Sequence, residues 1–361
     1  PTLGLSWKLL IFNLSDKIFN QDHEQIVYCS DKDLGLKAII GIHDTTLGPS
    51  IGGTRMWNYS TEQDGLKDVL RLSKAMSLKS SLAGLNAGGG KAVIIGDLKL
   101  KNQNFIKKYA SFINDINGKY WTAQDVNISS QDMIWMKDVT PFVVGMPEDK
   151  GGLGDSSHPT AYGVYLGMKA ASKFVYGNDS LEGKKIALQG IGKVGAKLIE
   201  YLAKENATIY VSDINKEILK NVTNKYKVRS FKNSELYSID LDIFSPCALG
   251  GILNSESIKK LKCKIVAGAA NNQLEDDKTH DIELKEKNII YVPDFLINAG
   301  GVISVYHEQI QDLSKEKVFA MTENIYSKVE DVLKLSSKNN ISTNVSAMKI
   351  ALDRINRNRK K

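Results

Sequence analysis

The sequence predicts an α/β protein of two domains, the second built on a doubly wound parallel sheet. The 361-residue length suits about two domains. The segment 145–160, "GMPEDKGGLGDSSHPT", is rich in the glycine, proline and serine that mark a boundary. Beyond it, short β-branched runs alternate with helical periodicity, as in parallel sheets covered by helices. We therefore expect domains over 1–145 and 146–336, with C-terminal helices from about 337 to 361 packing back on the first.

Periodicity within the first domain predicts a mixture of strands and helices. Short apolar runs predict strands over 26–29, 36–42 and 92–95. Helices are expected over 62–80 and 102–117, where apolar residues recur at helical spacing. The apolar stripe of the first of these helices is formed by Leu66, Val69, Leu70 and Leu72.

The start of the chain predicts an amphipathic helix. Its apolar residues fall at helical spacing: Leu3, Trp7, Leu10, Leu14 and Ile18. A removed organelle-targeting segment is the alternative. Lys8 interrupts the apolar stretch and no A-x-A cleavage site follows, so the pattern does not fit a secretory signal.

The second domain shows the strand–helix alternation most clearly. A helix over 161–177 is stopped by Gly177-Asn178, and a strand (186–189), a glycine turn and a helix to about Glu205 follow. Further strands are expected over 208–212, 241–244, 264–267 and 289–292. The last two helices are expected over 315–336 and 343–357.

Composition and charge exclude several classes of protein. The chain is 42% hydrophobic and 25% charged, which is typical of globular proteins with sizeable cores. Its net charge of +7 is dispersed apart from the terminal "RINRNRKK". That cluster suits a solvated helix end near the negative pole of the helix dipole, with a nucleic-acid patch as the alternative. No apolar run approaches the ~20 residues of a membrane span. We expect neither a nucleic-acid nor a membrane partner.

Cysteine and histidine usage indicates a reducing compartment and no metal. The three cysteines, Cys29, Cys247 and Cys263, are odd in number and form no CxxC pair. This favours free thiols and a cytoplasmic location. The five histidines lack metal-ligand spacing.

A glycine turn predicts a dinucleotide site in a Rossmann-type domain. The turn Gly190-Ile191-Gly192-Lys193-Val194-Gly195 has the pattern G-x-G-x-x-G between a predicted strand and a predicted helix. The first glycine permits the tight turn, the second lets a pyrophosphate approach the backbone, and the third lets the helix pack on the strand. The helix N-terminus offers N–H groups and a partial positive charge to the phosphates.

An acidic residue after the next strand favours NAD over NADP. Asp213 follows Gly190 at close to the ~20-residue spacing of such motifs. Its carboxylate would accept hydrogen bonds from the adenosine ribose and repel a 2′-phosphate. A glycine turn with no ligand is the alternative reading, which the agreement of strand, turn, helix and acid disfavours.

A second glycine-rich stretch, "AGLNAGGGKAVIIGD", lies in the first domain. It is not a phosphate loop, because Leu85 occupies the first glycine position and Ala92 replaces the hydroxyl residue after Lys91. Three glycines, Gly88 to Gly90, would bring the backbone close to a ligand and hold Lys91 in a tight, dry space. A cleft between the domains would bring this lysine to the dinucleotide.

Burial would tune Lys91 for proton transfer. A free lysine has a pKa of about 10.4 and is no base at neutral pH. Desolvation lowers this pKa, and a second ammonium such as that of Lys79 lowers it further. A lysine tuned in this way can move protons. The alternative is a surface lysine after a loop, although three glycines without Pro, Asp or Ser would make an odd surface turn.

Seven segments in order resemble the NAD(P)-dependent dehydrogenases of glutamate, leucine, phenylalanine and valine, closest to the leucine-specific branch. They are "LGPSIGGTRMW", "MSLKSSLAGLNAGGGKAVIIGD", "TAQDVN", "SDINKE", "PCALGGILN", "AGAANNQL" and "INAGGVISV". The resemblance runs from about Glu24 to the last helices. It implies reversible oxidative deamination, in which an L-amino acid, NAD and water give a 2-oxo acid, ammonia and NADH.

The resemblance also implies residue roles. The lysine of "GGGK", here Lys91, activates the water that attacks the imino acid and polarises the carbonyl in reverse. The lysine of "MSLK", here Lys79, pairs with the substrate α-carboxylate, helped by the backbone of Gly52 and Gly53. The aspartate of "AQDV", here Asp125, handles the proton of the amino group.

Three further roles follow from the same resemblance. Asn298 of "NAGG" would touch the amino group of the substrate. Asn271 and Thr160 would hold the nicotinamide end of the cofactor.

The substrate side chain is expected to meet an apolar pocket. Glutamate-specific relatives have a lysine where this chain has Ile51 and a serine where it has Val305. Phenylalanine-preferring relatives tend to have a glycine at Ala123 and a leucine near Val302. Met76 would add an adaptable wall. These residues favour leucine, valine and isoleucine, with the valine- and phenylalanine-specific enzymes as alternatives.

Two departures from the family and one other class of protein are noted. Gln124 replaces the usual glutamate before Asp125, and "GDSSHPTAYG" has fewer prolines than usual at the hinge, which predicts looser closure. An inactive protein that binds NAD and an amino acid is the alternative to an enzyme, but Lys79, Lys91 and Asp125 are all present. The resemblance further suggests a large homo-oligomer, with an octamer as the expected size.

Overall fold

The computed structural model describes residues 22–360, so the helix expected over the first residues lies outside the described part. The described chain divides into two compact units. The first holds the residues up to Gly154, Glu308–Asp312 and the residues from Ile355 onward, and the second holds Asp155–His307 and Leu313–Arg354. The boundary thus follows Gly154 rather than 145. Of the segment 337–361, which was expected to return to the first unit, only the residues from Ile355 onward belong to it. The preceding helix α13 (Lys315–Asn339) packs against α5 (Ser157–Tyr176) of the second unit.

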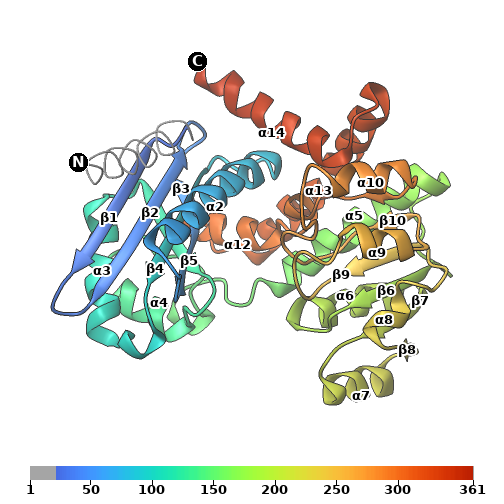
Figure 1. Ribbon diagram of the computed structural model, residues 1–361, viewed down its shortest axis with the longest axis horizontal. Helices are drawn as coiled ribbons and strands as arrows, with labels where there is room; N and C mark the ends of the chain where they lie inside the picture. The colour runs from blue at the N-terminus through green and yellow to red at the C-terminus, as the bar shows by residue number, and fades with distance from the viewer. Residues whose placement is uncertain (1–21, 361) are drawn as a thin grey trace, which may run out of the picture. The chain divides into compact units, whose positions relative to one another are not determined.

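The first unit is built on a five-stranded mixed sheet in the order β1-β2-β4-β3-β5 (Figure 1). Its strands are β1 (Gln25–Asp31), β2 (Leu36–Asp44), β3 (Ser50–Trp57), β4 (Gly88–Ile95) and β5 (Tyr120–Gln124). β2 pairs antiparallel with both β1 and β4, whereas β3 runs parallel to both β4 and β5. The sequence analysis missed β3, whose glycine pair weakens the strand signal, and the short β5.

Helices cover both faces of this sheet, and side-chain alternation assigns each residue to a face. On one face, Ile39 of β2 and Val93 of β4 form a core with Leu66, Val69 and Leu70 of α2 (Glu62–Leu82). Their neighbours Ile40 and Ile94 pack on the opposite side. That face is covered by α3 (Gln103–Asp115) and α4 (Ser130–Lys137), which supply Phe105, Tyr109, Met133 and Met136 to the larger core. Lys91 lies two residues before Val93 on β4, so its side chain is on the same face of the sheet, the face that α2 covers.

The three glycines before Lys91 belong to strand β4. β4 begins at Gly88, so its predicted start at 92 was too late. A Cβ atom on Gly89 would lie 2.1 Å from the backbone nitrogen of Ser77 on α2. A Cβ on Gly88 would lie 2.1 Å from the carbonyl oxygen of Asp44, and one on Gly90 would lie 2.6 Å from the ring of Tyr120. Each of the three positions thus requires glycine for the close packing of β4 against its neighbours.

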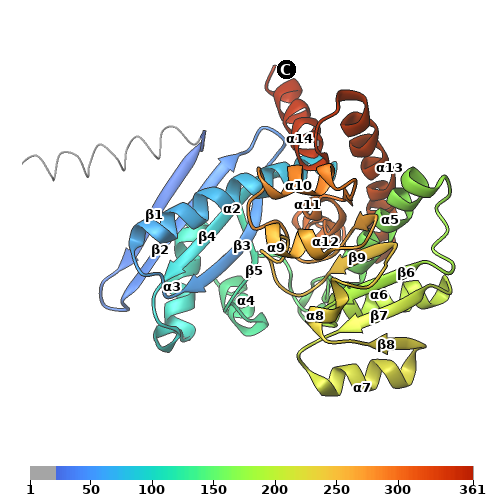
Figure 2. The same ribbon diagram turned by 45° about the vertical axis from the view of Figure 1, so that its right-hand side comes forward.

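The second unit is a six-stranded parallel sheet in the order β11-β10-β9-β6-β7-β8. Figure 2 shows β9, β6, β7 and β8 of this sheet. Its strands are β6 (Lys185–Gln189), β7 (Thr208–Ser212), β8 (Val228–Ser230), β9 (Ile243–Pro246), β10 (Ile265–Val266) and β11 (Ile290–Tyr291). The chain winds outward in both directions from β6 and β9, which confirms the doubly wound fold. The sequence analysis missed β8, three residues without a buried side chain.

Helices also cover this second sheet. α5 packs against α6 (Lys193–Lys204) and α13. A separate core joins Ala187, Phe244 and Val266 of the strands to the helices α8 (Asn233–Leu236), α9 (Ser255–Lys260) and α10 (His280–Glu286). The remaining helices are α7 (Lys216–Lys225), α11 (Asp294–Ile297), α12 (Gly300–Gln309) and α14 (Thr343–Arg359). Within residues 22–360, no helix is both long and apolar enough to cross a bilayer.

Two carboxylates, those of Glu308 and Asp44, hold segments of the first unit that are far apart in the sequence. The carboxylate of Glu308 accepts hydrogen bonds from the backbone N–H groups of Gly145 (2.7 Å), Met146 (3.2 Å) and Leu153 (2.8 Å). It therefore anchors the segment that leads to the boundary. Arg359, in the basic C-terminal cluster, forms an ion pair with the buried Asp44. The cluster thus has a structural role at its helix end.

Candidate active site and dinucleotide site

Lys91 and Asp125 form an ion pair on the α2 face of the first sheet. Lys91 lies near the middle of β4, and Asp125 directly follows β5, two strands away. The Nζ atom of Lys91 is 2.6 Å from Oδ2 of Asp125, and the lysine side chain is only 9% exposed. Two residues separated by 34 positions in sequence are thus brought into contact, as their expected shared role requires.

The pair has an electrostatic balance suited to proton transfer. Burial lowers the pKa of Lys91, although the charge of Asp125 opposes this effect. Burial acts to raise the pKa of Asp125, but the ammonium of Lys91 and the guanidinium of Arg55 outweigh it and hold this pKa below the usual aspartate value. Asp125 is therefore a carboxylate at neutral pH, beside an amine that loses its proton more readily than a free lysine.

Two glycines of β3, Gly52 and Gly53, allow Asp125 to approach Lys91. A Cβ atom on Gly53 of β3 would lie 2.7 Å from the carbonyl oxygen of Gln124 and 2.9 Å from Cβ of Asp125. A Cβ on Gly52 would lie 1.8 Å from the carbonyl oxygen of Gly90. The glycine pair therefore lets the end of β5 and the middle of β4 close around β3. Gln124 itself is exposed and donates a hydrogen bond to Ser130.

Arg55 is a member of this cluster that the sequence analysis did not identify. Its Nε atom is 3.0 Å from Oδ2 of Asp125, and its Nη1 atom is 2.9 Å from Oδ2 of Asp68 on α2. Arg55 was quoted within "GGTRMW" but given no role, because the contacts with Asp68 and Asp125 cross 13 and 70 residues of sequence. In the sequence, the one feature that could have pointed to Arg55 as a site residue was its position two residues after Gly53.

The other predicted substrate residues of the first unit differ in exposure. Lys79 lies in the last turn of α2 and is half-buried, as is Met76 one turn earlier. Ala123 on β5 is also half-buried. Ile51 has no exposed surface, because β3 is an inner strand flanked by β4 and β5. The role of Ile51 beside the substrate side chain stays a prediction.

The glycine turn of the second unit has the geometry of a dinucleotide site. Gly190 adopts a φ of +102°, and a Cβ there would lie 2.6 Å from that of Ala248. A Cβ on Gly195 would lie 2.4 Å from the carbonyl oxygen of Gly190, so this glycine lets α6 pack on the turn. By contrast, a Cβ on Gly192 would meet nothing within 4 Å. Gly192 caps α6 without a side-chain hydrogen bond, which leaves open space beside the helix N-terminus.

Asp213 is tied to this turn. Its Oδ2 atom accepts a hydrogen bond of 2.6 Å from the backbone N–H of Ile191, and its Oδ1 atom accepts one of 2.8 Å from Asn215. Within the turn, Ile191 is buried, Val194 is half-buried and Lys193 is exposed. The turn, the uncapped helix and the carboxylate fit the phosphates and ribose of a dinucleotide.

The remaining predicted site residues also belong to the second unit. The Nδ2 group of Asn298 donates hydrogen bonds to Oδ1 of Asn271 (2.7 Å) and to the carbonyl oxygen of Ala269 (3.1 Å), so two predicted residues lie in contact. Thr160, near the start of α5, donates to the carbonyl oxygen of Ser156. On α12, Val302 is buried and Val305 is half-buried.

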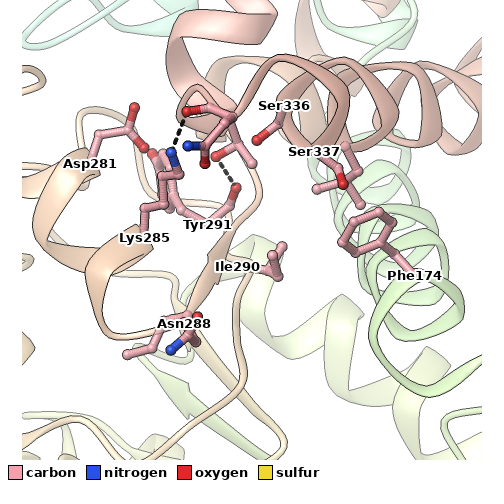
Figure 3. Close-up of a pocket in the computed structure, with 12 residues that line it drawn as sticks. Phe174, Asp281, Lys285, Asn288, Ile290, Tyr291, Ser336 and Ser337 are labelled. Carbon is pink, nitrogen blue, oxygen red and sulfur yellow. Dashed lines mark hydrogen bonds between the residues drawn. The ribbon is translucent and has the colours of Figure 1, made fainter.

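A separate cavity of about 260 Å³ lies between α10, β11 and the end of α13 (Figure 3). Lys285 donates a hydrogen bond to the carbonyl oxygen of Asn340 at its edge, and Thr343 donates one of 2.5 Å to that of Tyr291. None of the predicted site residues lines this cavity. Among the described residues, no group of three His, Cys, Asp or Glu side chains is placed to hold a metal ion.

Family models match most of the described chain. Residues 23–141 match the model described as the dimerisation domain of Glu/Leu/Phe/Val dehydrogenases. Residues 210–361 match the model described as glutamate/leucine/phenylalanine/valine dehydrogenase. Together these two matches span both units and include Lys91, Asp125 and Asp213.

Curated relatives cover nearly the full length. The chain is 46% identical over 340 residues to leucine dehydrogenase of Geobacillus stearothermophilus, covering 94% of this chain and 92% of that protein. It is 44% identical to phenylalanine dehydrogenase of Lysinibacillus sphaericus, covering 91% and 89%. It is 42% identical to L-tryptophan dehydrogenase of Nostoc punctiforme, covering 96% and 97%.

Solved structures agree with the fold. The crystal structure of the Nostoc punctiforme L-tryptophan dehydrogenase aligns with a TM-score of 0.86 at 41% identity, covering 96% of this chain and 99% of that one. A glutamate dehydrogenase from Thermus thermophilus aligns with a TM-score of 0.76 at 22% identity, covering 93% and 89%. At that identity the second match supports the fold alone.

Proposed function

Because the chain belongs to the Glu/Leu/Phe/Val family of amino-acid dehydrogenases, we propose that it catalyses the NAD-dependent, reversible oxidative deamination of leucine, valine and isoleucine. Membership makes it an oxidoreductase acting on an amino acid with a nicotinamide cofactor. The relatives leave the side chain open, since enzymes named for leucine, phenylalanine and tryptophan lie within 42–46% identity. The single observation that carries the proposed chemistry is the buried contact of 2.6 Å between Lys91 and Asp125.

The two groups of this pair have complementary tasks in the proposed reaction. The substrate enters as an ammonium ion and must lose a proton, which the Asp125 carboxylate accepts. The imino acid formed after oxidation must then be attacked by water. Lys91 in its neutral form takes the proton of that water, and its lowered pKa makes this neutral form easier to reach than in a free lysine. In the reverse direction the Lys91 ammonium polarises the carbonyl of the 2-oxo acid.

The substrate carboxylate needs a separate cation. We assign it to Lys79 at the end of α2, with the backbone of Gly52 and Gly53 alongside. The α-amino group is assigned to Asn298, and the nicotinamide end to Asn271 and Thr160. The nicotinamide supplies the hydride acceptor, and the protein supplies position and charge.

We assign NAD as the cofactor on account of Asp213. Its carboxylate already accepts the Ile191 N–H at the turn, so it is oriented toward the place where the adenosine ribose would lie. A ribose hydroxyl can donate to it, whereas a 2′-phosphate would bring a second anion against it. The glycine turn and the open space beside Gly192 accept the pyrophosphate.

The proposed side-chain preference rests on apolar residues. A glutamate side chain would bring a carboxylate into a site where Val305 replaces the polar residue of glutamate-specific relatives, and Ile51 replaces their lysine. An unpaired charge there costs several kcal/mol. Ala123, Val302 and Met76 favour a branched chain over an aromatic ring. Phenylalanine remains the second candidate substrate, because the relative that acts on it is 44% identical.

We also propose that the enzyme is a homo-oligomer, with an octamer as the expected assembly. The first unit matches a family model described as a dimerisation domain, which supports self-association.

The first prediction concerns Lys91. We expect Lys91→Ala to fold and to bind NADH, but to lose about 10²–10⁴-fold in kcat, as removal of a general acid–base group does. Steady-state kinetics with leucine, together with NADH fluorescence titration, measures both properties. A kcat within about tenfold of wild type would show that Lys91 does not have the assigned role.

The second prediction concerns the cofactor. We expect kcat/KM for NAD to exceed that for NADP by at least about tenfold, because Asp213 repels the 2′-phosphate. Asp213→Ser should narrow this ratio, and Asp242→Ser, which alters an aspartate before β9, serves as the control. Equal kcat/KM for the two cofactors in the wild-type enzyme would rule out the proposed role of Asp213.

The third prediction concerns the substrate. We expect kcat/KM for leucine to lie within about a hundredfold of the values for valine and isoleucine, because one methylene changes binding by only ~1–3 kcal/mol. Glutamate should lie far below all three. Kinetics on these four amino acids and phenylalanine tests the assignment, and efficient turnover of glutamate or a clear preference for phenylalanine would contradict it.

A further inference from the structure

We propose that Arg55 is a positioning residue that orients Asp125 and sets the pH at which Lys91 becomes active. The inference rests on the proposed roles of Lys91 and Asp125 and adds a third residue to them. Arg55 does not touch the place assigned to the substrate carboxylate, which is given to Lys79. It acts through the carboxylate of Asp125.

The contacts of Asp125 show how Arg55 restrains it. Nζ of Lys91 and Nε of Arg55 meet the same carboxylate oxygen, Oδ2, at 2.6 and 3.0 Å. Rotation of the carboxylate would stretch both charge-assisted contacts at once. The orientation of the group that receives the substrate proton is therefore held from β4 on one side and from β3 on the other.

Arg55 is itself held by Asp68 of α2. Nη1 of Arg55 contacts Oδ2 of Asp68 at 2.9 Å, and the same oxygen accepts a hydrogen bond of 2.7 Å from the hydroxyl of Tyr59. The other oxygen of Asp68 is 3.1 Å from Nη2 of Arg71. Side chains of Asp68 and Arg55 are 15% and 24% exposed, so solvent screens this network only in part. A planar guanidinium can reach two carboxylates in this way, and a lysine ammonium cannot do so with the same geometry.

The charges around the pair act on it with opposite signs. Burial is the main cause of the lowered pKa of Lys91; among the charges, Asp125 and Asp68 raise this pKa and Arg55 lowers it. Tyr120 donates to the carbonyl oxygen of Gly52, and burial raises its pKa to about 12, so it stays neutral. The other charged or titratable groups that act on the pair are Arg55 from β3, Asp68 from α2 and Tyr120 from β5, while Tyr59 and Arg71 contact Asp68.

These signs make the effect of each substitution distinct. Removing Arg55 takes away a positive charge that lowers the pKa of Lys91, so the acid limb of the kcat profile should move to higher pH. Removing the charge of Asp68 takes away a negative charge that raises this pKa, so the limb should move to lower pH. Loss of stability alone would shift neither limb.

The test measures kcat and KM against pH for leucine oxidation by wild type, Arg55→Ala, Arg55→Lys and Asp68→Asn. For Arg55→Ala we expect an acid limb about one pH unit higher. At its own optimum we expect kcat to be about ten- to a hundredfold lower, through misplacement of Asp125. Arg55→Lys should return the limb close to the wild-type pH but restore kcat only in part. Asp68→Asn should shift the limb the other way.

The matched control is Arg71→Ala, which removes an arginine that contacts Asp68 but not Asp125. It should leave the limb at the wild-type pH. The proposal is overturned if Arg55→Ala and Arg71→Ala have the same limb, or if Arg55→Ala lowers kcat equally at all pH values. If Arg55→Ala does not fold, the limbs of Arg55→Lys and Asp68→Asn decide: coincident limbs overturn the proposal.

Lys91→Ala separates this inference from the function on which it rests. If Lys91→Ala is as active as wild type, the assigned catalytic pair is wrong, and with it the basis for Arg55. If Lys91→Ala is inactive while Arg55→Ala retains the wild-type profile, the pair remains and the role of Arg55 is excluded.

Discussion

The ion pair between Lys91 and Asp125 is the interaction on which the candidate active site depends. A buried ammonium is unfavourable alone, and a carboxylate 2.6 Å away compensates for its lost hydration. The compensation is incomplete, so the pKa of Lys91 stays below its ordinary value while Asp125 stays ionised. An amine that can release a proton beside a carboxylate that can receive one is the combination that oxidative deamination requires.

Close backbone packing in the first sheet makes this pair possible. Gly89 lets α2 approach β4, and Gly53 lets the end of β5 bring Asp125 toward Lys91. The second unit uses glycine differently. There Gly190 and Gly195 are packed against protein, whereas Gly192 leaves open space beside a helix N-terminus. The same residue type thus permits a dry ion pair in one unit and leaves open space at a helix N-terminus in the other, and only the surroundings distinguish the two cases.

The parts of the fold that were predictable were those with a local signal. The long helices α5, α6, α13 and α14 and most strands of the second unit followed from periodicity, and the glycine turn followed from glycines with fixed spacing. β3 was missed because Gly52 and Gly53 interrupt its apolar pattern, and β8 because it buries no side chain. The start of β4 was placed at 92 instead of 88, since a strand made of glycines cannot be recognised without the helix that packs on it.

The site itself was predictable only in part. Lys91 and Asp125 came from motifs, but their contact depends on strand order, which no short stretch encodes. Arg55 and Asp68 were missed for the same reason, because their contacts join β3, β5 and α2. Ile51 was named from a motif as a pocket residue, and its complete burial on an inner strand is a property that the motif alone does not give.

The pKa of Lys91 tests the account most directly. NMR of protein labelled with [¹³Cε]lysine would follow its titration, with the Lys91 signal assigned by its absence from Lys91→Ala. We expect a pKa below the ordinary value of about 10.4. In Asp125→Asn we expect a still lower value, because the charge of Asp125 raises it. A Lys91 that titrates at or above the ordinary value, or whose pKa rises when Asp125 is neutralised, would contradict the account.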